Sequence, residues 1–132
     1  HVLEPLFGYL ILAEKLLSKN GSFFVGPWNF GPTSKQNMRV IDLVKIIKKK
    51  LNSRSNIIIK KKEKKFYNKK FKIFESKDLN INSSKAFNKL KWKPRLSIDS
   101  AVKLTVDWYK SFKNKENLLV ASKKQIKNYL NS

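Results

Sequence analysis

The stretch NSSKAFNKLKWKPRLSIDSAVKLTVDWYKSF, residues 82–112, decides the fold of this chain. It predicts a short helix that Asn82 caps and a second helix that begins after Ser97, because Asn and Ser are good N-caps. Between them it predicts a turn at Trp92 and Pro94, because proline cannot continue a helix. Apolar side chains recur at helical spacing in both helices. They are Ala86, Phe87 and Leu90 in the first helix, and Ile98, Ala101, Leu104, Thr105, Trp108 and Phe112 in the second.

This pattern resembles the C-terminal end of the extended short-chain dehydrogenase/reductase family, which contains nucleotide-sugar epimerases and 4,6-dehydratases. The resemblance is carried by Ser84, Lys85, Ala86, Leu90, Trp92, Pro94, Ser97, Ile98, Ala101, Val102, Thr105, Trp108 and Tyr109. The chain departs from the family at Lys91, where Gly is usual, and at Asn82, where Asp is usual. Residues 1–10 and 28–32 narrow the resemblance to members of the family that act on a CDP-sugar. The resemblance covers nearly the whole chain and is weakest over residues 52–67.

The resemblance implies an α/β fold: the C-terminal substrate-binding part of such an enzyme, built of helices with a few short strands and lacking the Rossmann half. Residues 1–35 would supply a helix and strand at the edge of the Rossmann half plus a substrate loop, and residues 36–132 the substrate-binding domain. The chain has no Gly-x-x-Gly-x-x-Gly turn and no Tyr-x-x-x-Lys pair at the place that the family's active site requires, and it begins with His1. We therefore expect it to start within a longer chain, whose N-terminal half would bind NAD and carry the catalytic residues, and which would form a homodimer.

Periodicity predicts the remaining elements. We expect helices at residues 4–20 and 37–51, strands at 22–26, 56–59 and 71–75, and a last helix opened by a capping box at 122–125. The predicted buried faces are Leu6, Tyr9, Leu10, Ala13, Leu16 and Leu17 in the first helix, and Val40, Leu43, Val44, Ile47 and Leu51 in the second. These faces are too extensive to cover one another, so we expect some of them to lie against the N-terminal half.

The formal net charge is +21, which would suit a small basic nucleic-acid-binding domain. However, only Arg39, Arg54 and Arg95 of the 30 basic residues are arginine, the residue that best recognises phosphate in bidentate geometry. We favour a lysine-rich solvated surface, with the lysine run at residues 60–65 as an exposed loop. The charge would still attract an anionic nucleotide sugar.

Cysteine is absent, which excludes disulfides and thiolate metal sites and fits a cytoplasmic protein. No signal peptide or membrane span is evident, because Glu4, Glu14 and Lys15 bracket the apolar residues of the first helix. His1 is the only histidine, so a histidine metal cluster is excluded, and we expect a structural role for it.

Three residues are candidates for substrate binding. In the family, the Asn of an Asn-hydrophobic-Gly loop lies against the nucleotide diphosphate, and this position is Asn29. A side-chain amide can offer a donor and an acceptor to a ligand. The alternative is that Asn29 closes its own turn, and both interpretations stay open. The family also has a basic residue that contacts phosphate and, three positions later, a polar or acidic residue that contacts the ribose, which correspond to Lys72 and Glu75. Both are alternatively ordinary exposed strand residues.

The resemblance implies that the complete enzyme removes water from a CDP-sugar with bound NAD, in the biosynthesis of surface polysaccharide. The fragment would contribute substrate binding and would be inactive alone. A sibling epimerase or dehydratase with another nucleotide remains the alternative enzyme class.

Overall fold

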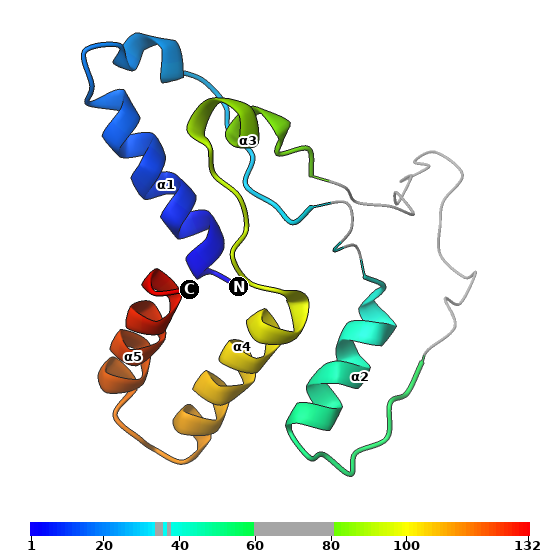
Figure 1. Cartoon of the computed structure of the whole chain (residues 1–132). Helices are drawn as coiled ribbons and strands as arrows, with labels where there is room; N and C mark the ends of the chain where they lie inside the picture. The colour runs from blue at the N-terminus through cyan, green and yellow to red at the C-terminus, as the bar shows by residue number, and fades with distance from the viewer. Residues whose placement is uncertain (34–35, 37, 60–80) are drawn as a thin grey trace, which may run out of the picture.

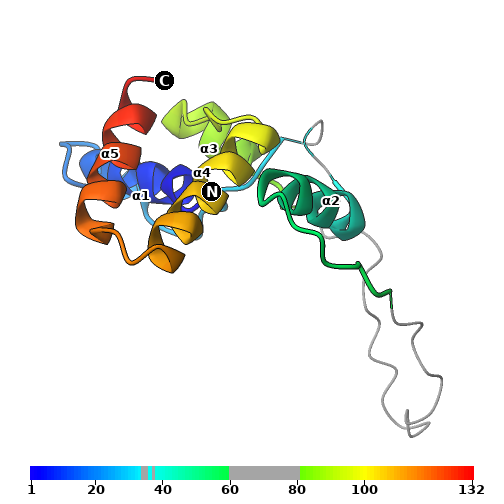
Figure 2. The same cartoon turned by 90° about the horizontal axis from the view of Figure 1, so that it is seen from below.

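The computed structural model describes residues 1–33, 36, 38–59 and 81–132. In chain order its elements are α1 (Leu3–Leu16), the 3-10 helix η1 (Gly21–Phe24), α2 (Val40–Lys50), α3 (Ser84–Leu90), α4 (Ile98–Lys113) and α5 (Leu118–Leu130). Helix α1 contacts η1 and α3, while α4 contacts both α5 and α2 (Figure 1). Seen from below, α2 stands at one side of the other helices, next to α4 (Figure 2).

The core lies where α1, α3 and the loop after α3 meet. Ala86, Leu90 and Trp92 are buried there, as the helical spacing and the turn at Pro94 predicted. Partly buried apolar side chains surround these three residues. They are Phe7, Ile11, Leu12, Phe24, Trp28, Phe30 and Phe87.

Helix α3 begins and ends as the local sequence rules require. The Asn82 side chain accepts a hydrogen bond from the Ser84 amide at 2.9 Å, which confirms the predicted capping contact, although Ser83 is the residue directly before the helix. The helix ends at Lys91, whose φ of 56° and ψ of 20° lie in the left-handed region. Glycine adopts this conformation at the lowest cost, which explains why Gly is usual at this position of the family that the chain resembles.

Helix α1 packs through a different face from the one predicted. Phe7, Ile11 and Leu12 lie against the core, whereas most of the predicted face, including Leu10 at 68% and Leu17 at 89%, is exposed. Gly8 is on the packed face, and a Cβ there would lie 2.3 Å from the Phe30 ring. The helix is apolar on both sides, so its periodicity did not identify the side that this chain covers.

The predicted faces of α2 and α4 also need correction. No residue of α2 is buried. In α4 the buried residues are Val102 and Val106, while Phe112 is 59% exposed. Helix α4 is contacted on two sides, by α2 and by α5, and this arrangement determines which of its side chains are covered.

The strands predicted at residues 22–26 and 56–59 are wrong. Residues 21–24 form η1, in which the amides of Gly21 and Phe23 donate to the carbonyls of Ser18 and Asn20. Residues 56–59 have no regular structure, and Ile58 and Ile59 are exposed. A strand requires a paired neighbour, and the described part of the chain contains none. The strand predicted at 71–75 lies outside the described residues.

The capping box predicted at residues 122–125 is also wrong. Helix α5 begins at Leu118, and the Asn117 side chain caps it by accepting from the amides of Leu119 and Val120. Ser122 lies inside the helix and accepts a hydrogen bond from Trp108 Nε1 at 3.1 Å. Asn is as good an N-cap as Ser, and here the earlier residue is used.

Candidate functional site

The loop that carries Asn29 is anchored on both sides. Before it, Lys85 Nζ donates to the Pro27 carbonyl at 2.9 Å and lies 4.2 Å from the centre of the Trp28 ring. After it, the Phe30 ring meets Trp92 edge-to-face with centroids 5.0 Å apart. The fold therefore fixes this exposed loop against the core and α3.

Asn29 itself is exposed, and its Nδ2 donates to the Asn82 carbonyl at 3.4 Å. This contact reaches the start of α3 rather than closing the turn of Asn29. Within the described residues its side-chain oxygen accepts no hydrogen bond. The proposed substrate contact of Asn29 stays a prediction, and Lys72 and Glu75, the other two candidates, lie outside the described residues.

A buried carboxylate, which the sequence did not single out as a contact residue, connects α1 with the two C-terminal helices. Glu4 is 9% exposed. Its Oε1 accepts from the amides of Arg95 at 3.0 Å and Leu96 at 2.7 Å, and its Oε2 accepts from the Tyr129 hydroxyl at 2.9 Å. The Glu4 backbone carbonyl also accepts from Trp92 Nε1 at 3.2 Å. We call these four residues and Glu4 the Glu4 network.

The Tyr129 hydroxyl is one of the hydrogen-bond donors of this network. Burial, together with the hydrogen bond to the Glu4 carboxylate, raises the pKa of Tyr129 well above its ordinary value. The hydroxyl is protonated at neutral pH and donates a hydrogen bond to Glu4 Oε2. The sequence did not single out Tyr129, and its partner lies 125 residues away.

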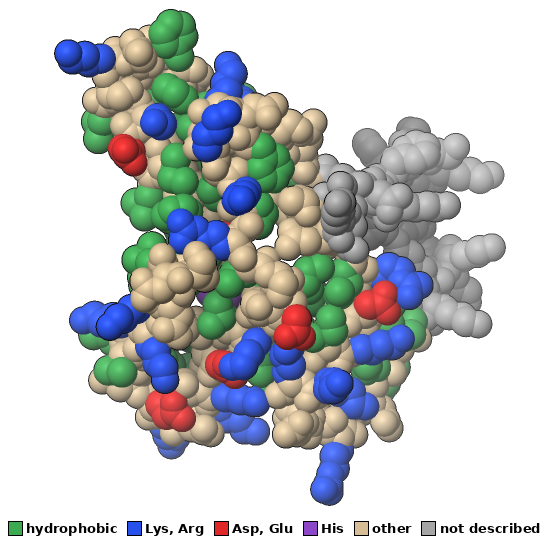
Figure 3. Space-filling model, in the orientation of Figure 1, with side chains coloured by type: hydrophobic (Ala, Val, Ile, Leu, Met, Phe, Trp, Pro, Cys, Tyr) green, Lys and Arg blue, Asp and Glu red, His purple; other side chains and the backbone are tan. Residues whose placement is uncertain are grey.

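Arg95 holds the C-terminal end of α5. Its Nη1 donates to the carbonyls of Tyr129 and Leu130, each at 3.3 Å, and its guanidinium carbon lies 4.2 Å from the centre of the Phe7 ring. Arg39 instead pairs with Asp42 at 2.8 Å. Two of the three arginines thus have structural partners, and on the face in Figure 3 the basic side chains are spread over the molecule rather than gathered in one patch. On this face the described residues therefore form no concentrated basic patch.

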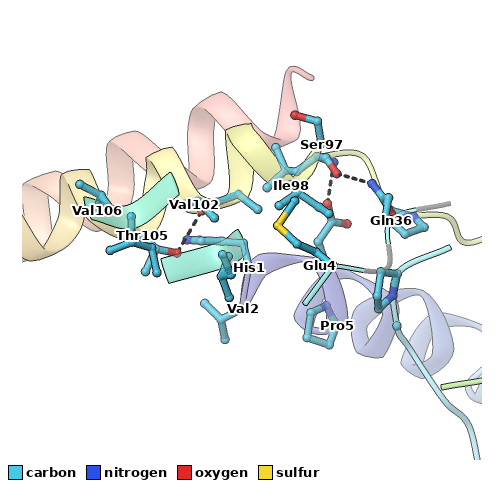
Figure 4. A pocket seen from close by; sticks show the side chains of 18 of the residues that line it. His1, Val2, Glu4, Pro5, Gln36, Ser97, Ile98, Val102, Thr105 and Val106 are labelled. Atoms are coloured by element: carbon cyan, nitrogen blue, oxygen red, sulfur yellow. Dashed lines mark hydrogen bonds between the residues drawn. The ribbon is translucent and has the colours of Figure 1, made fainter. Parts of the chain in front are cut away.

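A groove of about 810 Å³ opens between α2 and the rest of the molecule (Figure 4). Leu43, Ile47 and Leu51 of α2 line one wall, and side chains of α4 line the other. At its end near the core, Gln36 Nε2 donates to the Leu96 carbonyl at 3.1 Å, next to the bond between Leu96 and Glu4. The groove is thus mainly apolar along α2 and α4, and its polar side chains are those at this end together with His1 and, on α4, Thr105 and Tyr109.

The described residues show no group that could hold a metal ion and no helix long and apolar enough to span a membrane. His1 Nδ1 accepts a hydrogen bond from the Leu3 amide at 3.3 Å, a structural contact at the start of α1.

No family model matches the chain. A comparison with curated proteins supports a distant relationship to the nucleotide-sugar dehydratases, and the helical architecture is consistent with the substrate-binding part of an extended short-chain dehydrogenase/reductase. The relative is the CDP-glucose 4,6-dehydratase of Salmonella typhimurium, which is 28% identical over 132 residues. The match covers 100% of this chain and 34% of the relative, so the chain spans about a third of the relative's length.

Proposed function

We propose that this chain is the C-terminal, substrate-binding part of a nucleotide-sugar dehydratase that converts CDP-glucose to CDP-4-keto-6-deoxyglucose with loss of water. The observation that carries the proposal is the similarity to a CDP-glucose 4,6-dehydratase along the whole chain. In this proposal residues 1–35 and 36–132 keep the division predicted above, and the complete protein is a cytoplasmic homodimer.

Several of the residues that carry the resemblance stabilise the fold. Ala86, Leu90 and Trp92 form the buried cluster, Ser97 caps α4, and Val102 is buried within α4. A shared set of this kind supports a shared scaffold, while function has to be argued from the site. The proposed chemistry of this chain is therefore limited to substrate binding, through Asn29, Lys72 and Glu75.

The described residues do not fit NAD. A dinucleotide site needs glycines that leave room for the pyrophosphate, but the space beside three of the four glycines is filled. A Cβ on Gly8 would meet the Phe30 ring, one on Gly21 would meet the Leu16 carbonyl, and one on Gly31 would meet Ile81. We therefore assign NAD to an N-terminal Rossmann half of the complete protein.

The exposed apolar side of α1 supports the presence of such a half. Leu6 and Tyr9 of this helix, and Val2 and Leu17 directly before and after it, are each at least 46% exposed. Adjacent η1 adds Phe23 at 75%. A helix that is apolar on both sides is typically covered on both sides, and a large exposed apolar surface marks an interaction site.

The complete protein encoded by the gene is expected to convert CDP-glucose to a product that mass spectrometry finds lighter by one water. The glucose derivatives of UDP, dTDP and GDP serve as matched controls for the nucleotide. Turnover of one of these in preference to CDP-glucose would identify the sibling enzyme class. The absence of turnover with all four would refute the proposed function.

Asn29→Ala is expected to weaken binding of CDP-glucose by the complete protein about tenfold, the equivalent of roughly 1.4 kcal/mol, because a hydrogen bond to a charged group contributes about that much. Titration calorimetry measures the affinity. Asn128→Ala, at an exposed position of α5, is the control and should leave the affinity unchanged. Equal affinities for the two variants would show that Asn29 serves only its contact with Asn82.

A further inference from the structure

The walls of the groove differ in chemistry from the rest of the surface. Lysine and arginine make up 30 of the 132 residues of the chain, yet none is among the described residues that line the groove. None is among those that line the adjoining hollow of about 360 Å³ either. Among the described residues of the lining, Glu4 is the one acidic side chain, and its carboxylate is already engaged in the Glu4 network. A surface this poor in charge suits contact with protein rather than with water.

The charged residues nearby join α2 to α4 without entering the groove. Lys50 Nζ forms an ion pair with Asp99 at 2.7 Å, and Lys110 Nζ donates to the Lys50 carbonyl at 2.8 Å. Helix α2 is thereby held beside α4 although none of its own residues is buried. Its apolar residues Leu43, Ile47 and Leu51 face the groove instead of a packed core.

The first residues of the chain lie where the two hollows meet. His1 and Val2 line both of them, and Figure 1 places the N-terminus between α1 and α4. His1 is held there, because its carbonyl accepts from the Glu4 amide at 3.0 Å and its Nδ1 accepts from the Leu3 amide. A polypeptide joined to the His1 amino group therefore starts where the two hollows meet.

From this placement we propose that the groove between α2 and α4 receives the polypeptide that immediately precedes His1 in the longer protein. The inference rests on the proposed function, which assigns the chain to a longer protein. The Salmonella typhimurium relative has the necessary additional length, because this chain matches 34% of it. In this proposal the segment before His1 is apolar and covers Ile47 and Ala101 in the groove.

Thr105 provides the test, because it is exposed and lines both hollows. In the complete protein, with any other cysteines replaced by serine, Thr105→Cys is expected to react with a thiol reagent at least tenfold more slowly than Lys103→Cys. Lys103 is an exposed residue of the same helix and is absent from the lining of both hollows. In denaturant the two rates should become equal. Equal rates in the native protein would overturn the proposal.

A photoreactive label on the same cysteine identifies the occupant. The expected cross-links fall within about ten residues upstream of His1, since ten extended residues span at most about 36 Å. Cross-links to a more distant segment, to a second copy or to nothing would overturn the proposal, as would a gene product that starts at His1. If the complete protein turns over CDP-glucose but forms no upstream cross-link, only this inference is refuted. If it forms the cross-link but shows no turnover, only the proposed reaction is refuted.

Discussion

Trp92→Ala is expected to lower the free energy of unfolding by about 3–5 kcal/mol, the usual cost of truncating a buried large aromatic residue. Trp92 is 2% exposed. Its ring meets Phe30 edge-to-face at 5.0 Å and stacks on Phe87 at 5.7 Å, so the substitution would leave a cavity between the substrate loop and α3. It would also leave the Glu4 carbonyl without the indole donor. Denaturant unfolding followed by circular dichroism measures the loss.

Two further variants separate the causes of this loss. Trp92→Phe keeps a ring in the cluster but removes the indole N–H, and it is expected to cost about 1–3 kcal/mol. Phe112→Ala removes an aromatic side chain that is 59% exposed, and it is expected to change the stability by less than about 0.5 kcal/mol. If Trp92→Ala cost no more than Phe112→Ala, the buried cluster would not be the core of this fold.

Short-range rules were sufficient for residues 82–97. The contact of Asn82 with the first turn, the turn at Pro94 and the capping of α4 by Ser97 each depend on atoms a few residues apart. The spacing of Ala86 and Leu90 also identified the buried side of α3 correctly. In a helix of seven residues with one apolar side, periodicity leaves no choice of face.

The longer helices have more than one apolar side, and tertiary packing determines which side is buried. Helix α1 has one apolar set that includes Leu6 and Leu10 and another that includes Phe7 and Ile11, and the second set packs on the core. The strand at residues 22–26 failed for a related reason, because a run such as Phe23, Phe24 and Val25 forms a strand only beside a pairing neighbour. Local sequence does not state which neighbour is present.

The Glu4 network could not be predicted from the sequence for a further reason. Glu4 looked like one of the charges that bracket an apolar helix, and its hydrogen-bond partners are 88 to 125 residues away. A carboxylate in the first turn of a helix is normally explained by the helix dipole. Here it accepts hydrogen bonds from the loop before α4 and from the last turn of α5, so its role follows only from the tertiary fold.

Glu4→Ala is expected to destabilise the protein by about 3–5 kcal/mol, because it leaves three donors without an acceptor and each buried unsatisfied group costs about 1–3 kcal/mol. The three donors are the amides of Arg95 and Leu96 and the hydroxyl of Tyr129. The loss should appear in denaturant unfolding at neutral pH. Glu14→Ala, at an exposed position of the same helix, is the control and should cost less than about 0.5 kcal/mol.

A double-mutant cycle with Tyr129→Phe tests whether the loss comes from the network. Glu4 and Tyr129 share a direct hydrogen bond of 2.9 Å, so the two substitutions should be non-additive by about 0.5–3 kcal/mol. Additive effects would mean that the hydroxyl contributes nothing to the attachment of α5.

The same bond also predicts a dependence on pH. Folding raises the pKa of Tyr129, so the stability that its proton provides is complete below the unfolded value of about 10 and declines at higher pH. The stability difference between wild type and Tyr129→Phe should therefore be constant near neutral pH and shrink in alkali. A difference that stayed constant through the alkaline range would show that the hydroxyl is not held by the Glu4 carboxylate, and the Glu4 network would then lose its link between α1 and the C-terminal helix.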